Sequence, residues 1–235
     1  MDNETEVSNG RRRRAIPLVI VVVLVIASGL TAWFSSRPTT TSVVGPEGVL
    51  VFNVPNLASA SSTVHGTPVD GIGCQSGAKE VVKYHVHAHL SIYVDGRQER
   101  LPAGIGITEP RVVQRTTAGP FLDVGIYDCL YWLHTHSYDG IIHIESPSKR
   151  AFTLGQFFAI WNQKLGPTRV GPATGTVIVF ENGKRFTGDP TDVPLLAHGD
   201  IQIDVGSPVV AFQPFTFKVT GGCGEGTNSC SVKKK

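Results

Sequence analysis

The chain has 235 residues, which allows one main domain together with an anchor and tails. Apolar residues make up 41% of it and charged residues 17%, so it is too apolar and too weakly charged to be disordered throughout. Outside residues 1–34 and the three C-terminal lysines, 14 basic side chains accompany 16 acidic ones. This balance lacks the positive excess that binds phosphate backbones, so it argues against a nucleic-acid partner.

An uncharged apolar segment follows a basic cluster near the N-terminus. Residues 15–34 carry no charge, and as a helix they would span ~30 Å, which is the thickness of a bilayer core. Four arginines, at positions 11–14, precede this segment and favour a cytoplasmic N-terminus. The sequence therefore predicts a cytoplasmic tail at 1–14 and a single-pass signal anchor at 15–34 in the cell membrane. A cleaved signal peptide stays an alternative, because Ala27-Ser28-Gly29 offers small residues for cleavage.

The remaining chain divides into three parts. Residues 35–70 are rich in Ser, Thr, Pro and Val and are predicted to form a flexible tether. Residues 71–220 form the expected extracytoplasmic domain, and residues 221–235 form a cysteine-containing tail. In an oxidising compartment the four cysteines favour two disulfides, Cys74–Cys129 and Cys223–Cys230, although two other pairings stay open.

The external domain shows strand patterns and one helix pattern. Residues 83–95 alternate between apolar and polar and end in Asp95-Gly96, which predicts a strand and a hairpin turn. Thr153 and Gln156 have capping-box spacing before an apolar helix that ends near Gln163. The other predicted strands cover residues 97–107, 127–135, 141–145, 176–181, 184–187, 201–205 and the region of 215–219.

This element order indicates an α+β domain with a mixed or antiparallel sheet and one helix. A hairpin, a helix, a second hairpin and a final strand follow one another, and two strands are inserted after the first hairpin. This order resembles that of a β-grasp sheet with an inserted strand pair, preceded here by the predicted transmembrane helix.

Histidine is concentrated in two short segments. His85, His87 and His89 share one face of the first predicted strand, because residues two apart on a strand point the same way. In the second segment, His134 and His136 form one pair at the same spacing. On the following predicted strand, His143 and Glu145 form another. The alternation predicts a site for a divalent metal, since imidazoles suit Cu(II) and zinc, with nickel as a further candidate.

Strand geometry limits which histidines share an ion. Neighbours two apart are ~6.6 Å apart and can meet at one ion, whereas His85 and His89 are ~13 Å apart on a straight strand. The predicted site therefore combines two of the first three histidines with those of the second segment. His87, His134 and His136 are expected to be the most necessary ligands, and affinity should fall below about pH 6 as imidazole gains a proton.

Several alternatives stay open. The histidines could form a proton-titrating or structural cluster without metal. Cys129 and His134 have the C-x4-H spacing of a thiolate–copper site, which requires a free Cys129. Glu145 beside a metal could act as a general base in a metal-dependent enzyme, and an envelope interaction module is a third class of function.

Four motifs together resemble a family of uncharacterised bacterial proteins, mainly actinobacterial, that are secreted or membrane-anchored. The motifs are HVHAHL at 85–90, YWLHTH at 131–136, GIIHIE at 140–145 and LGQFF at 154–158. The resemblance extends from about Asp70 to Gly206. It implies the shared histidine pattern and an external location, and it implies no reaction.

The sequence as a whole favours a membrane-anchored extracytoplasmic protein that captures, senses or hands over copper or zinc.

The predicted membrane orientation of the chain can be tested. A reporter enzyme fused after Lys235 should be active only outside the cytoplasm, because Arg11–Arg14 hold the N-terminus inside. Activity of a reporter that functions only in the cytoplasm would contradict the predicted orientation.

Overall fold

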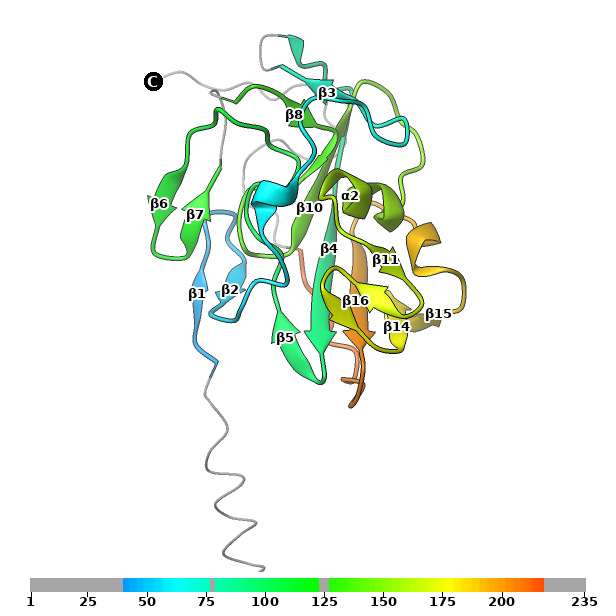
Figure 1. The fold of residues 1–235 in the computed structure, drawn as a ribbon. Helices are drawn as coiled ribbons and strands as arrows, with labels where there is room; N and C mark the ends of the chain where they lie inside the picture. The colour runs from blue at the N-terminus through cyan, green and yellow to red at the C-terminus, as the bar shows by residue number, and fades with distance from the viewer. Residues whose placement is uncertain (1–39, 77–78, 123–126, 218–235) are drawn as a thin grey trace, which may run out of the picture. The chain divides into compact units, whose positions relative to one another are not determined.

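The computed structural model describes residues 40–76, 79–122 and 127–217 (Figure 1). Its main feature is a seven-stranded sheet, and β4 (Tyr84–Val94) is the central strand of this sheet. Alternate residues of this strand, such as Val86, Ala88 and Leu90, are buried in the main hydrophobic core. The other face of β4 carries the histidines. The period-two pattern therefore forms the strand that the sequence predicts.

The sheet is mixed. Its other strands are β5 (Arg97–Glu99), β9 (Leu133–His134), β10 (Ile141–Ser146), β14 (Val177–Glu181), β15 (Lys184–Phe186) and β16 (Gly199–Val205). Their order is β15-β14-β16-β4-β10-β9, and β5 pairs with β4 beside this path. Strand β16 is parallel to β4, and the other pairings in the sheet are antiparallel. The predicted α+β class with a mixed sheet is confirmed.

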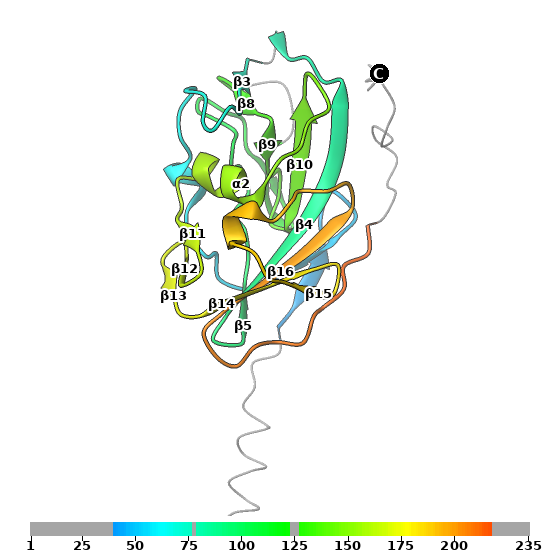
Figure 2. The same cartoon turned by 90° about the vertical axis from the view of Figure 1, so that its right-hand side faces the viewer.

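Helix α2 (Leu154–Ile160) covers the apolar face of the sheet (Figure 2). Thr153 and Gln156 form the predicted capping box, in which the side chain of each residue accepts a hydrogen bond from the backbone N–H of the other. Phe157 and Phe158 pack with strand residues in one core cluster. The helix ends three residues before the predicted Gln163, because Asn162 adopts a positive φ of 56°.

Short elements surround the sheet. They are β1 (Ser42–Val44), β2 (Leu50–Phe52), η1 (Ala60–Ser62), β3 (Cys74–Gln75), β6 (Gln114–Thr116), β7 (Gly119–Phe121), β8 (Leu130–Tyr131), β11 (Leu165–Gly166), β12 (Arg169–Val170), β13 (Ala173–Thr174) and η3 (Pro190–Asp192). Strands β1 and β2 form a hairpin on the histidine side of the sheet, opposite α2 (Figure 2). This hairpin supplies Glu47 to the histidine cluster.

Three described segments differ from the sequence-based expectations. The described part of the expected tether at 35–70 contains the β1–β2 hairpin, whose Val49 and Val51 are buried. The strand expected at 97–107 ends at Glu99, because the following residues turn and Gly104 and Gly106 adopt positive φ. The strand expected at 127–135 is divided into β8 and β9, and residues 215–217 form no strand.

The second face of the sheet is polar although it is largely buried. On β16 it presents Asp200, Gln202 and Asp204, whose side chains accept bonds from the backbone of Phe215, Gln213 and Val210 respectively. The segment after β16 thus covers one half of this face through polar contacts. The histidines occupy the other half.

One of the two predicted disulfides is confirmed. Cys74 and Cys129 are joined, with Cα atoms 5.5 Å apart. This bond removes the free thiol that the thiolate–copper alternative requires. Cys223 and Cys230 lie outside the described residues, so their pairing stays a prediction.

The predicted membrane anchor at 15–34 also lies outside the described residues. Within the described part of the chain, no helix combines the length and apolar character of a membrane span.

Candidate metal centre

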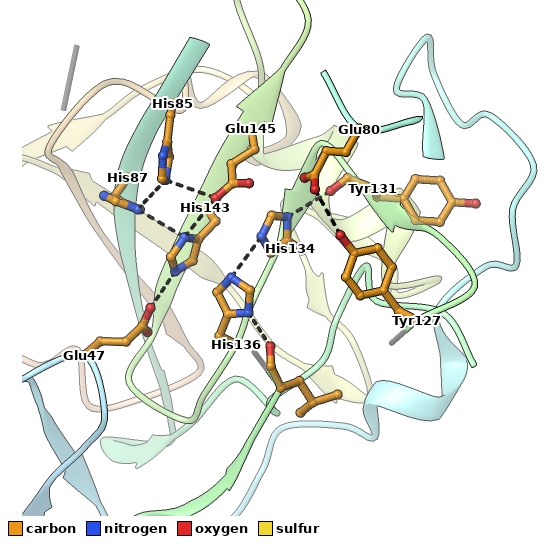
Figure 3. A network of polar contacts seen from close by, with 11 residues as sticks. Glu47, Glu80, His85, His87, Tyr127, Tyr131, His134, His136, His143 and Glu145 are labelled. Atoms are coloured by element: carbon orange, nitrogen blue, oxygen red, sulfur yellow. Dashed lines mark hydrogen bonds and ion pairs between the residues drawn. The ribbon is translucent and has the colours of Figure 1, made fainter. Parts of the chain in front are cut away.

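Strand register brings the predicted site residues together. On the histidine face, His143 of β10 lies opposite His87 of β4 and opposite His134 of β9. Glu145 of β10 lies opposite His85 of β4. Three adjacent strands thus place these side chains on one surface, where Figure 3 shows them facing one another. His136, two residues beyond His134, completes the set.

Four ligand atoms form a closed ring at the first part of this site. His85 Nε2 lies 3.0 Å from His87 Nε2, which lies 3.1 Å from His143 Nδ1 (Figure 3). The Glu145 Oε1 atom closes the ring, at 3.0 Å from His85 Nε2 and 3.7 Å from His143 Nδ1. We call these four residues the β4–β10 group.

A second set of ligand atoms lies beside the first. The Nε2 atoms of His134 and His136 are 3.2 Å apart, and we call these two residues the His134–His136 pair. The His134 and His143 rings are stacked with centroids 5.3 Å apart. One ligand atom from each of His134, His136, His143 and Glu145 lies within 4.8 Å of the other three.

These separations fit ligands of a common cation. Two imidazole nitrogens, each ~2.0–2.1 Å from zinc or a similar ion, stand ~2.9–3.4 Å apart for bond angles between square and tetrahedral. The nitrogen–nitrogen distances of 3.0, 3.1 and 3.2 Å fall in that interval. The residues present therefore suit a divalent metal with nitrogen and oxygen ligands.

Contacts outside the ring orient the histidines as in known metal sites. His143 Nε2 donates to Glu47 Oε1 at 2.8 Å, which leaves Nδ1 directed into the ring. His134 Nδ1 donates to the Tyr131 carbonyl at 2.9 Å, and His136 Nδ1 donates to the Leu122 carbonyl. A carboxylate or carbonyl on the far nitrogen is the usual partner of a metal-binding imidazole, because it sets the tautomer and ring angle.

Burial keeps three of the imidazoles neutral. It lowers the pKa of His87 to about 3, assisted by the nearby His143 and His85. Burial and His143 likewise lower the pKa of His136 to about 4, and burial and His136 lower the pKa of His134 well below its ordinary value. Neutral imidazoles present lone pairs, which is the form that binds metal.

For His143, in contrast, the neighbouring acidic residues raise the pKa. Burial lowers its pKa, but the charges and hydrogen bonds of Glu47 and Glu145 outweigh burial and raise the pKa to about 10. In return, His143 lowers the pKa of both carboxyl groups below their ordinary values, although burial alone raises them. Without metal, a proton on His143 therefore supplies the positive charge that the two carboxylates require.

The other histidines lie elsewhere. His89, predicted as a ligand, shares the face of His85 and His87, but its Nδ1 contacts Asp200 Oδ1 at 2.9 Å and its ring stacks on Phe215. It belongs to neither group of candidate ligands. His65 is exposed, and His198 packs near Phe217 in the turn before β16.

Sequence reasoning missed two acidic residues. Glu47 lies in a turn of the expected tether, and no spacing signal links it to His143. Asp139 lies in the turn before β10, where its Oδ1 accepts from the Ile141 N–H. Its Oδ2 atom is buried, and burial and the Glu47 charge raise the Asp139 pKa well above its ordinary value, which favours the neutral carboxyl group.

A cavity of about 520 Å³ lies next to Asp139. His89, Asp139, Arg100 and Tyr138 are among its lining residues, whereas the β4–β10 group and the His134–His136 pair are not.

Comparisons with protein-family models, curated proteins and solved structures found no match. The resemblance inferred from the four motifs therefore stays a prediction, and the assignment depends on the geometry of the site.

The segment at 104–107 holds β9 and its histidine in place. Gly106 accepts from Tyr131 N–H through its carbonyl, and Ile105 exchanges bonds with Thr135. Gly106 has a φ of +75°, and a Cβ there would lie 2.4 Å from the Leu133 carbonyl oxygen and 3.0 Å from His134 Cβ. A side chain at this position would therefore displace His134.

A substitution at Gly106 tests this support. Gly106→Ala should lower the free energy of unfolding by ~1–3 kcal/mol, through backbone strain and displacement of β9, as measured by denaturant titration. Gly166→Ala is the matched control, since a Cβ there meets nothing within 4 Å, and its change should stay within ~0.5 kcal/mol. Equal midpoints for both variants would contradict the close approach to β9.

Proposed function

We propose that this chain is a membrane-anchored extracytoplasmic protein that binds copper or zinc for capture, sensing or handover. The observation that carries the proposal is the closed ring of three imidazole nitrogens and one carboxylate oxygen in the β4–β10 group. An ion held by these three imidazoles and one carboxylate would have four protein ligands and need no water, which is typical of binding rather than of catalysis.

The chemistry of the ligands narrows the choice of metal. The described cysteines are joined in a disulfide, and the sequence has one methionine, Met1. Imidazole and carboxylate ligands without soft sulfur favour Cu(II) or zinc over Cu(I). Nickel remains compatible with the same donors.

The position of Glu145 supports binding over hydrolysis. A general base needs a free carboxylate beside a metal-bound water. The Glu145 Oε1 atom instead contacts two imidazoles, and the cavity of about 520 Å³ is not lined by Glu145. At the β4–β10 group the geometry of Glu145 therefore favours binding over hydrolysis.

Partial exposure of the site suits exchange of the ion. The side chains of His85 and Glu145 are 14% and 15% exposed, so the β4–β10 group reaches the surface at one end. An ion could enter there without opening the core. The anchor predicted at 15–34 would hold this entrance outside the membrane.

The strand order supports the finer fold assignment. Strands β4 and β5, helix α2, strands β14 and β15, and β16 parallel to β4 follow the sequence of a β-grasp sheet. In this interpretation β9 and β10 are the inserted pair. The insertion then supplies three of the histidines, whereas the parent sheet supplies His85 and His87.

Metal should stabilise the fold if the proposal is right. At a thousandfold excess over the dissociation constant, a ligand that binds only the folded state adds ~4 kcal/mol of stability. Thermal unfolding of the full-length chain in detergent, without a polyhistidine tag, should therefore shift upward with Cu(II) or Zn(II). His87→Ala should lose most of that shift, because it removes the atom that joins His85 to His143 in the ring.

The matched control is His65→Ala, which removes an exposed imidazole that belongs to neither group of candidate ligands. This variant should keep the full metal-induced shift. The comparison uses the shift caused by metal, so a change in the stability of the metal-free variant does not affect it. Equal shifts in all three proteins, or no shift in the wild type, would contradict the proposed function.

A further inference from the structure

We propose that the cluster holds two metal ions, one in the β4–β10 group and one at the His134–His136 pair, with Glu145 as the bridge between them. The inference rests on the proposed function and adds the number of ions and the ligand that joins them.

One ion is too few for the ligands present. Five imidazoles and Glu145 converge, whereas a zinc-type site takes four ligands. The short distances also separate into two sets. His85, His87 and His143 are connected at 3.0 and 3.1 Å, while His134 and His136 contact each other at 3.2 Å through their own Nε2 atoms.

The His134–His136 pair has an independent need for a cation. Both Nδ1 atoms face backbone carbonyls, which only accept hydrogen bonds, so each Nδ1 carries the proton. Each neutral ring then has a lone pair on Nε2, and the two lone pairs face each other at 3.2 Å. Two acceptors at that distance repel unless a positive charge lies between them. A metal ion satisfies both lone pairs.

Glu145 is placed to join the two ions. Its Oε1 atom belongs to the β4–β10 ring, and the carboxylate also lies within the 4.8 Å group that contains His134 and His136. A carboxylate has two oxygens and can bind one ion with each. Figure 3 shows Glu145 between His85 on one side and His134 on the other. Bridged ions in two-metal sites stand ~3.5–4 Å apart.

His143 contributes to only one of the two ions. Its Nε2 donates to Glu47, so Nδ1 is the single nitrogen left to bind metal, and the short contact directs it toward His87. The first ion then has four protein ligands. The second has two imidazoles and one carboxylate oxygen, which leaves a position for water or a small anion. We infer that the second ion is the more weakly held and exchangeable one.

Metal stoichiometry tests the inference directly. The full-length chain without a polyhistidine tag is titrated with Cu(II) and followed by elemental analysis and electron paramagnetic resonance. We expect two ions per chain, with loss of the ordinary single-ion copper signal in the loaded protein because neighbouring Cu(II) ions couple. His136→Ala should bind one ion per chain and regain the single-ion signal, since the second ion loses a ligand while the β4–β10 ring stays intact.

His89→Ala is the control, because it removes an imidazole from the same face of β4 that contacts Asp200 instead of either group. This variant should still bind two coupled ions. One ion per wild-type chain would overturn the two-ion inference and leave the proposed function standing, whereas no bound ion would overturn both. Two ions retained in His136→Ala would also overturn the assignment of the second ion.

Discussion

The antiparallel register between β4 and β10 is the constraint on which the site depends. It places His143 opposite His87 and Glu145 opposite His85, so alternate residues of two strands meet on one face. Their other alternate residues, including Val86 and Ile144, form the core under α2. A slip by one residue would bury the histidines and expose the core residues, so the packing that stabilises the sheet also enforces the ligand geometry.

Burying so many polar groups requires compensation within the cluster. Imidazoles and carboxylates lose hydration at this face, and an unpaired charge there would be costly. Glu47 and Glu145 both lie beside His143, so the histidine is a partner for each of these two carboxylates. This arrangement explains how the site persists without metal. It also explains why metal is suited to it, since a cation can replace the proton on His143 as the counter-charge of two carboxylates.

Local pattern predicted the parts of the site that lie on regular strands. Alternation around His85 and His143 placed them on one face, and the Thr153 capping box marked the helix start. Local patterns could not predict contacts between segments that are distant in the sequence. Glu47 contacts His143 from 96 residues away in the sequence, and it lies in a short hairpin whose composition predicts a tether. His89 contacts Asp200, which is 111 residues away, instead of the other histidines. Tertiary pairing of this kind has no local spacing signal.

The central claim is that imidazole nitrogens on three adjacent strands hold the metal. X-ray absorption at the copper or zinc edge of the loaded full-length chain tests it most directly, because the first coordination shell reports ligand type and distance. The account predicts nitrogen and oxygen neighbours at ~2.0–2.1 Å together with the outer-shell scattering of several imidazole rings. A sulfur neighbour at ~2.3 Å, or an oxygen shell without imidazole scattering, would contradict it.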